Sequence, residues 1–210
     1  MGLKIVKEFE YYTDKMHDKD FHDWFVAFIT AKDDVYWKTP SSSTGKYHPP
    51  DEVKEWGQLL HCKRLCHLVD SVCRMNEENF EDTQFAYDIL VAGSIIHDLY
   101  KAGLEGTEER TNKLHPQMIH YELTAIAKGY VVDNAIISNY LYVLAKVCLY
   151  HEGIWTLASV EPMPSSLRPF CEAMHDLDYF LSRRDMFDCM QVGWGVTKEE
   201  ENPISLTMGN

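Results

Sequence analysis

His97 and Asp98 stand side by side near the end of an apolar run from Phe85 to Leu99 that is predicted to form a buried helix. A buried imidazole beside a buried carboxylate must be paired with other groups or bind a metal ion. Neighbouring helical residues point about 100° apart, so the two side chains rarely converge on one ion by accident. The dipeptide alone fits two interpretations equally well: a core histidine beside a capping aspartate, or part of a metal site.

Further imidazoles and carboxylates lie near the ends or on the apolar faces of the predicted helices. Five successive helices each offer a nitrogen or oxygen ligand, in the order His61, His97 with Asp98, His115 and His120, His151, and Asp178. Helical bundles commonly build metal sites from inward-pointing residues on facing helices. Ligand sets of imidazole and carboxylate without cysteine suit Mn²⁺, Fe, Co²⁺, Ni²⁺, Zn²⁺ or Mg²⁺. The pattern predicts one or two bound divalent metal ions.

This order of residues resembles the motif order H…HD…H…H…D of the HD-domain superfamily of metal-dependent phosphohydrolases. The segment Ile96–Gly103, which contains Lys101, is close to the HDxxKxG form of that family. Upstream, Ser42–Pro49 and Gly57–Arg64 are similar to segments that a subset of these proteins carries around the first histidine. The resemblance covers about residues 40–185 and implies an HD-domain helical bundle with phosphohydrolase activity.

The resemblance also implies which residues bind metal. One ion would be held by His61, His97, Asp98 and Asp178, and a second by His151 and either His115 or His120, with Asp98 bridging the two ions. Proline often follows the third histidine of the family, as Pro116 follows His115, which favours His115. An alternative alignment places His120 at that position. Asp178 fits the last position better than Asp176, because Tyr-Phe-Leu-Ser-Arg follows it.

Two basic side chains near these ligands, those of Lys101 and Arg64, are candidates for catalysis together with Asp98. Two metal ions about 3.5 to 4 Å apart would clamp a phosphate and lower the pKa of a bridging water. Lys101 is placed to stabilise charge on the phosphoryl oxygens or to orient that water. Arg64, one helical turn beyond His61, is predicted to act in the same way. For each cation, a solvated or salt-bridged surface charge is an equally weighted alternative.

The polar loop from Ser41 to Lys46 is a candidate for substrate binding. Its Gly45-Lys46 pair is not a Walker motif, because Tyr47 follows in place of Ser or Thr and the first glycine is missing. A glycine-containing loop with hydroxyls and a lysine can still cradle a phosphate through backbone N–H groups. The predicted substrate contacts are Ser43, Thr44, Lys46 and His48, against the alternative of an ordinary surface loop. The remaining histidines, His17, His22, His67 and His175, are expected to lie outside the site.

Helical periodicity predicts an all-α fold. Two amphipathic helices are expected within residues 3–30, broken near Asp18, and further helices over 51–75, 85–99, 116–129, 133–150 and 166–190. Residues 33–50 and 102–114 are expected to be irregular. The predicted organisation is N-terminal helices and the polar loop over 1–50, packed on an HD domain over 51–190, with a tail over 191–210.

The formal net charge of −13 argues against long nucleic acid as a partner, because such partners demand a basic face. A small phosphate compound can still bind if metal ions lie between it and the protein.

No apolar run reaches the roughly 18 to 20 residues of a membrane span. The N-terminal residues lack a signal-peptide pattern, and the six scattered cysteines are expected to be reduced. We therefore expect a cytoplasmic protein without a membrane partner; whether it forms a homo-oligomer stays open.

The expected function is hydrolysis of a phosphoester or phosphoanhydride bond in a small molecule, with a nucleotide as the favoured substrate. Two alternatives remain. Some HD-fold proteins hold two irons on the same ligand order and oxidise their substrates with O₂, and the ligands alone do not separate the two activities. A non-catalytic module that senses a nucleotide is the second alternative, although a degenerate domain would be expected to have lost some ligands.

Overall fold

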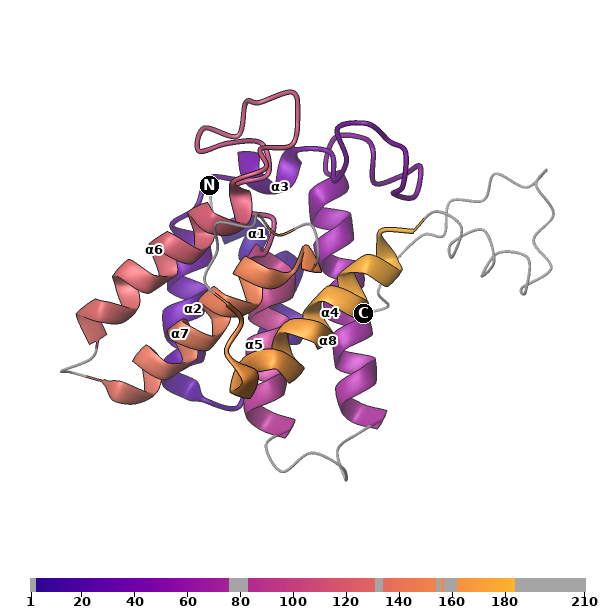
Figure 1. Cartoon of the computed structure of the whole chain (residues 1–210). Coiled ribbons are helices and arrows are strands. Elements are labelled where there is room, and N and C mark those ends of the chain that lie inside the picture. Colours follow the sequence, from indigo (N-terminus) through magenta and orange to yellow (C-terminus); the bar gives the residue numbers. More distant parts are fainter. Residues whose placement is uncertain (1–2, 76–82, 131–133, 154–155, 157–161, 184–210) are drawn as a thin grey trace.

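The computed structural model describes residues 3–75, 83–130, 134–153, 156 and 162–183. Over these residues the chain contains α-helices and no β-strand, so the prediction of an all-α bundle is confirmed. The helices are α1 (Leu3–Thr13), α2 (Lys19–Thr30), α3 (Val35–Lys38), α4 (Gly57–Met75), α5 (Thr83–Ile96), α6 (His115–Tyr130), α7 (Ala135–Tyr150) and α8 (Arg168–Leu181), with the 3₁₀ helix η2 (Ser165–Leu167) before α8 (Figure 1).

Helix α5 is the most deeply buried helix described and packs against α1, α4, α7 and α8. Every residue from Tyr87 to Ile96 is buried, as expected for a helix that is mostly apolar around its circumference. Helices α6 and α7 pack closely as a hairpin, and α7 begins at a capping residue, Asn134, whose side chain accepts hydrogen bonds from two backbone N–H groups. The C-terminal end of α5 therefore delivers His97 and Asp98 into the middle of the bundle.

The two N-terminal helices belong to the same packed core. Phe9 of α1 and Phe21, Phe25 and Ile29 of α2 are fully buried, and these helices pack on α4, α5 and α7. The predicted break near Asp18 is confirmed, because Asp18 caps α2 by accepting a hydrogen bond from the Phe21 N–H. The division of the chain at residues 50 and 190 stays a prediction, and the predicted tail lies outside the described residues.

The prediction that a helix begins at Asp51 is wrong, because α4 begins at Gly57. The chain turns sharply just before that point: Trp56 has a φ of +67°, and its N–H donates to the Lys38 carbonyl over 2.7 Å. Gly57 is required there, since a Cβ atom on it would lie 1.9 Å from the Glu52 carbonyl oxygen. This close approach folds residues 51–56 back over the start of α4 instead of extending the helix.

Other helix bounds also differ from the predicted ones. Helix α5 ends at Ile96 instead of Leu99, because the chain turns immediately afterwards. Helix α8 ends at Leu181, and residues 184–190 of the helix predicted over 166–190 lie outside the described residues. The short α3 helix interrupts the stretch 33–50, which was expected to be irregular.

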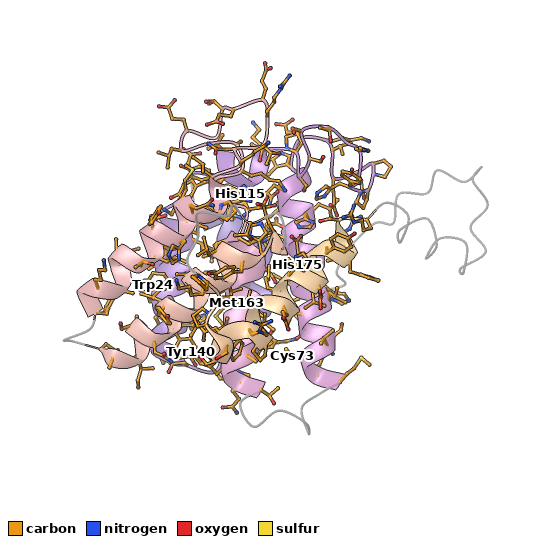
Figure 2. All side chains as sticks on the ribbon, viewed as in Figure 1. Trp24, Cys73, His115, Tyr140, Met163 and His175 are labelled. Carbon is orange, nitrogen blue, oxygen red and sulfur yellow. The ribbon has the colours of Figure 1, made fainter. Side chains whose placement is uncertain are left out.

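Two loops, residues 39–56 and 97–114, project from the same end of the bundle (Figure 1). They touch where Ser43 Oγ lies 3.3 Å from Thr111 Oγ1. His115 is labelled at this end in Figure 2, whereas Cys73 lies towards the other end. The five described cysteines are buried and free, and Cys189 lies outside the described residues. No described helix has the length and apolar character needed to cross a bilayer.

Candidate metal centre

Four histidines and two aspartates from five helices converge where the loops meet the bundle. His61 comes from α4, His97 and Asp98 follow α5, His115 opens α6, His151 follows α7, and Asp178 comes from α8. The four histidines and Asp98 are almost completely buried, and the Asp178 side chain is 16 % exposed. We call these six residues the His/Asp cluster.

The turn after α5 explains why Asp98 and Lys101 act together. The His97 N–H still donates to the Gly93 carbonyl as in a helix, and the Lys101 N–H then donates to the Asp98 carbonyl. This tight turn places Lys101 Nζ 2.5 Å from Asp98 Oδ2. Burial acts to lower the pKa of Lys101, but the Asp98 carboxylate outweighs burial and keeps that pKa raised. Lys101 is therefore a cation held against the cluster.

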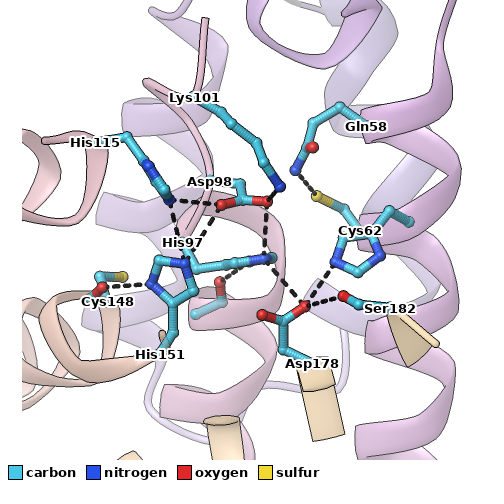
Figure 3. Close-up of polar contacts among 12 residues, drawn as sticks. Gln58, Cys62, His97, Asp98, Lys101, His115, Cys148, His151, Asp178 and Ser182 are labelled. Atoms are coloured by element: carbon cyan, nitrogen blue, oxygen red, sulfur yellow. Dashed lines mark hydrogen bonds and ion pairs between the residues drawn. The ribbon is translucent and has the colours of Figure 1, made fainter. Parts of the chain in front are cut away.

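Asp98 lies at the centre of the cluster (Figure 3). Its Oδ1 is 2.8 Å from His115 Nε2 and 3.4 Å from His151 Nε2, and its Oδ2 is 3.4 Å from His97 Nε2. Burial acts to raise the pKa of Asp98, but Lys101 and the surrounding imidazoles hold it well below its usual range. Asp98 is thus an ionised carboxylate that contacts three histidines and a lysine.

Asp178 joins the other side of the cluster. Its Oδ1 lies 2.9 Å from His61 Nε2 and 3.8 Å from His97 Nε2, and it accepts a hydrogen bond from Ser182 Oγ. Burial acts to lower the pKa of His61, but hydrogen bonds to Asp178 and Glu52 raise it to about 10. His97 is different, because burial lowers its pKa and keeps the ring neutral.

In all four histidines Nδ1 points out of the cluster towards an acceptor. His97 Nδ1 lies 3.2 Å from the Gly93 carbonyl, His115 Nδ1 lies 2.8 Å from the Asn112 carbonyl, and His151 Nδ1 lies 2.7 Å from the Cys148 carbonyl. His61 Nδ1 lies 3.2 Å from Glu52 Oε2. A carbonyl acceptor fixes the proton on Nδ1 and leaves the lone pair on Nε2, which is the tautomer that metal-binding histidines usually adopt.

The ligand atoms of the cluster fit a cation. His97 Nε2 is buried without a hydrogen-bond partner. His115 Nε2 and His151 Nε2 are 3.2 Å apart, so in the tautomer above the lone pairs of the two rings would face each other. Such convergent buried acceptors need a proton or a metal ion between them. Three overlapping groups of ligand atoms each lie within 4.8 Å of one another, and their nitrogen and oxygen chemistry suits a transition-metal dication.

Comparison with known proteins returned no match. No family model, curated protein or solved structure is significantly similar to the chain. The resemblance to the HD-domain superfamily therefore rests on the residues and their spacing, and membership of that family stays a prediction.

A pocket of about 320 Å³ opens beside the cluster. Its walls come from the polar loop after α3, the turn after α5, the end of α7 and the end of α8. None of the lining residues is aliphatic; they are Ser41, Ser42, Ser43, Thr44, Tyr47, His48, Lys101, Thr111, His151, Glu152, His175, Asp178, Tyr179, Ser182 and Arg183. A pocket with this lining suits a polar ligand that reaches the cluster.

The structure places three of the four predicted substrate contacts at the pocket. Ser43, Thr44 and His48 line the pocket, but Lys46 does not. Lys46 is exposed, and its Nζ lies 4.9 Å from the centroid of the Tyr47 ring. The loop therefore offers hydroxyls and an imidazole to a ligand, and its lysine points elsewhere.

Arg64, a predicted catalytic cation, does not line the pocket either. Its guanidinium lies 2.7 Å from Glu52 Oε1 and also pairs with both carboxylate oxygens of Asp51. Arg64 therefore contacts Glu52, the carboxylate behind His61, and is not among the residues that line the pocket.

Sequence reasoning missed Glu52, a fully buried carboxylate. Its Oε2 lies 3.0 Å from His48 Nδ1 and 3.2 Å from His61 Nδ1. Burial acts to raise the pKa of Glu52, but these two imidazoles and Arg64 lower it well below its usual value. A carboxylate behind a ligand histidine fixes the orientation of the ring and makes the ring more basic. Glu52 was missed because residues 51–56 were predicted to be helical.

His175 was expected to lie outside the site, but it contacts the cluster through the backbone. Its Nδ1 lies 2.7 Å from the His151 carbonyl, and its ring lines the pocket. Gly153, with a φ of +59°, makes this contact possible, because a Cβ atom there would lie 2.5 Å from His175 Cε1. The contact between His175 and Gly153 therefore supports the turn that carries His151.

The structure separates the two alternatives for the third histidine. His115 lies in the cluster, whereas His120 is half-buried on α6 with its Nδ1 3.2 Å from the Ala145 carbonyl. We expect His115→Ala to weaken metal binding by at least about tenfold, because it removes a ligand nitrogen. His120→Ala, which removes the same side-chain volume from the same helix, should keep the metal. Calorimetric titration of each variant with a metal ion tests this prediction. Metal binding that is retained in His115→Ala and lost in His120→Ala would contradict it.

The raised pKa of His61 predicts how the stability of the metal-free protein depends on pH. The His61 pKa is raised from 6.5 to about 10, so the folded state holds this proton more tightly than the unfolded chain does. The resulting stabilisation is fully present below about pH 6.5 and is lost as the pH rises towards 10. In the presence of a chelator, the free energy of unfolding should fall by roughly 1 kcal/mol per pH unit between about pH 7 and 8.5. Urea unfolding over this range measures it.

The range stops at about pH 8.5 because thiols of the unfolded chain begin to ionise there. Burial raises the pKa of Cys62 and Cys66, so these thiols would add a second loss of stability at higher pH. The variant His61→Gln is the control and should show a shallower slope. A metal-free protein whose stability stays constant or rises from pH 7 to 8.5 would be inconsistent with a protonated His61.

Proposed function

We propose that this protein is a metal-dependent phosphohydrolase that acts on a small phosphate ester or anhydride, with a nucleotide as the expected substrate. One observation carries the proposal: the Nε2 atoms of three buried histidines converge on Asp98, next to a polar pocket that also contains Lys101. A site of this composition suits a metal ion that holds a phosphate.

The cluster would hold the metal ions in two overlapping sets. His61, His97, Asp98 and Asp178 would bind one ion, and His115 and His151 would bind a second that shares Asp98. Bound ions of this kind polarise phosphoryl oxygens and lower the pKa of a coordinated water. The rings of His97, His115 and His151 are oriented for this role by the backbone carbonyls behind them.

Lys101 would stabilise the charge that develops on the phosphoryl group. Its ammonium lines the pocket and is held against Asp98, so it is placed before a substrate arrives. A fixed donor in a site sheltered from water stabilises developing charge more than a solvated one does, because no reorganisation is needed during the reaction. The turn from Asp98 to Lys101 supplies this rigidity.

The polar loop would bind the part of the substrate that is not cleaved. Ser43 and Thr44 present hydroxyls, and His48 is held by Glu52 at the buried edge of the pocket. Burial lowers the pKa of His48 and favours a neutral ring that can donate or accept a hydrogen bond. The net charge of −13 further favours a small substrate, because a long polyanion would be repelled by the surface.

A phosphate-release screen on metal-loaded protein tests the proposal. The purified chain is stripped with a chelator, reloaded separately with Mn²⁺, Co²⁺, Ni²⁺, Zn²⁺, Mg²⁺ or Fe²⁺, and assayed with nucleoside mono-, di- and triphosphates and with sugar phosphates. We expect phosphate release with at least one metal and none after chelation. Unchanged turnover after chelation would contradict the proposal, as would O₂ consumption by an iron-loaded protein that releases no phosphate.

A further inference from the structure

Arg183, at the end of α8, is held between two tyrosine rings at the pocket. Its guanidinium carbon lies 3.8 Å from the centroid of the Tyr179 ring and 4.9 Å from the centroid of the Tyr47 ring. Tyr179 precedes Arg183 by one helical turn, whereas Tyr47 belongs to the polar loop. Stacking on aromatic faces positions a guanidinium without using its N–H groups.

The donors of Arg183 are not committed to a carboxylate of the described residues. Its Nε is buried and has no hydrogen-bond partner in the described part of the chain. Three other arginines differ: Arg64 pairs with Asp51 and Glu52, Arg74 with Asp70, and Arg168 with Glu172. In a chain with 33 acidic and 20 basic residues, a pocket arginine held by tyrosines is available for an anionic ligand.

Arg183 and the His/Asp cluster border the same pocket. Arg183 follows Asp178 by five residues and lies just beyond the end of α8 at Leu181. Both residues line the same pocket, together with Lys101 at the cluster. The pocket volume of about 320 Å³ is near the lower end of ligand sites, which span roughly 300 to 1,000 Å³. A compact ligand can therefore reach both positions.

The lining of the pocket also includes several hydroxyl groups. Ser41 lines the pocket, is fully buried, and its Oγ has no hydrogen-bond partner among the described residues. Ser182 and Thr44 line the same space. A buried hydroxyl without a partner is costly unless a ligand or water satisfies it. The pocket thus favours a ligand that carries hydroxyl groups.

We propose that Arg183 binds a second phosphate group of the substrate, so that the pocket accepts a compact, hydroxylated molecule with two phosphates. This inference rests on the proposed phosphohydrolase function: one phosphate lies at the His/Asp cluster and is cleaved, and the other lies on Arg183 and is kept. The planar guanidinium suits this role because it can bind a phosphate through two parallel hydrogen bonds.

Matched pairs of phosphate compounds test this inference. The pairs are fructose 6-phosphate with fructose 1,6-bisphosphate, and adenosine 5′-monophosphate with adenosine 3′,5′-bisphosphate. The Mn²⁺-loaded wild-type protein is compared with the variants Arg183→Gln and Arg183→Lys. Arg168→Gln is the control, because it removes an exposed arginine from the other end of α8. The readout is the ratio of KM values within a pair, or the ratio of dissociation constants from calorimetry if no phosphate is released.

In the wild-type protein, the bisphosphate of at least one pair should bind at least about tenfold more tightly than the monophosphate, the effect of one charge-assisted contact. Arg183→Gln should abolish this preference, Arg183→Lys should retain part of it, and Arg168→Gln should leave it unchanged. Melting temperatures of all variants show whether they are folded. The absence of a tenfold preference in both pairs, or an equal loss for both members of a pair in Arg183→Gln, would overturn the inference.

The result also distinguishes this inference from the proposed function. Phosphate release without a preference for bisphosphates would leave the hydrolase function standing and overturn the role of Arg183. Binding of a bisphosphate that depends on Arg183, without phosphate release under any metal, would support the role of Arg183 as a phosphate-binding residue and count against hydrolysis.

Discussion

Replacing Asp98 with asparagine should reduce both metal binding and turnover more than any other single substitution in the chain. The Asp98 carboxylate contacts His97, His115 and Lys101 at once. Asparagine has the same volume but carries no charge, so it cannot offset metal dications. We expect kcat/KM to fall by at least about a thousandfold, because in the proposed site this single group would support both metals and also fixes the position of Lys101.

The same substitution should also destabilise the metal-free protein. Lys101 would keep its charge next to a neutral amide, and removing one partner of a buried ion pair typically costs about 3 to 5 kcal/mol. Metal content, turnover and urea unfolding of Asp98→Asn measure the three effects. Asp88→Asn is a suitable control, because Asp88 is a fully buried carboxylate of α5 that contacts His17, Asp18 and Tyr140 away from the cluster.

Asp88→Asn should lower the stability but leave the metal content of the folded protein unchanged. This pair of variants therefore separates the loss of a buried charge from the loss of a metal ligand. If Asp98→Asn keeps its full metal content and its turnover, the reacting site lies elsewhere in the protein.

Replacing Lys101 with alanine should leave the metal in place and slow turnover. Lys101 contacts Asp98 and lines the pocket, but a lysine ammonium is not a metal ligand. Loss of one preorganised donor of this kind typically costs about 10² to 10³ in kcat. Single-turnover rates and metal content on the same preparation check this prediction.

Lys32→Ala is the matched control for that prediction. Lys32 is also a partly buried lysine close to the turn after α5, where it contacts Tyr100 and Glu122, but it does not line the pocket. Its removal should change stability more than turnover. A Lys101→Ala variant that turns over as fast as the wild-type protein would show that this ammonium does not act on the reacting phosphate.

The residues of the His/Asp cluster could be predicted from the sequence because each lies at a recognisable place on a helix. His97 and Asp98 end an apolar run, and His115 precedes a proline that begins a helix, so their positions follow from local rules. His115 and His120 could not be separated by chemistry alone. They are five residues apart on α6 and hence about 140° apart around its axis, and only packing decides which face is turned inward.

Glu52 and Arg183 could not be predicted, for two different reasons. Glu52 reaches His61 because the chain folds back before α4, and that reversal depends on the contact between Gly57 and the Glu52 backbone. Arg183 lines the pocket and lies against Tyr47 from a loop that is distant in the sequence. Both contacts join segments whose separation in the sequence carries no periodic signal, so tertiary structure is needed to find them.

The position of a bound metal ion is the most direct test of the His/Asp cluster. Crystals of the protein grown with Mn²⁺ can be measured with X-rays at an energy where manganese scatters anomalously. We predict an anomalous peak within bonding distance of His97 Nε2 and an Asp98 carboxylate oxygen, and its loss in crystals of Asp98→Asn. A peak bonded to other residues, or no peak at saturating Mn²⁺ together with undiminished phosphate release, would contradict this account.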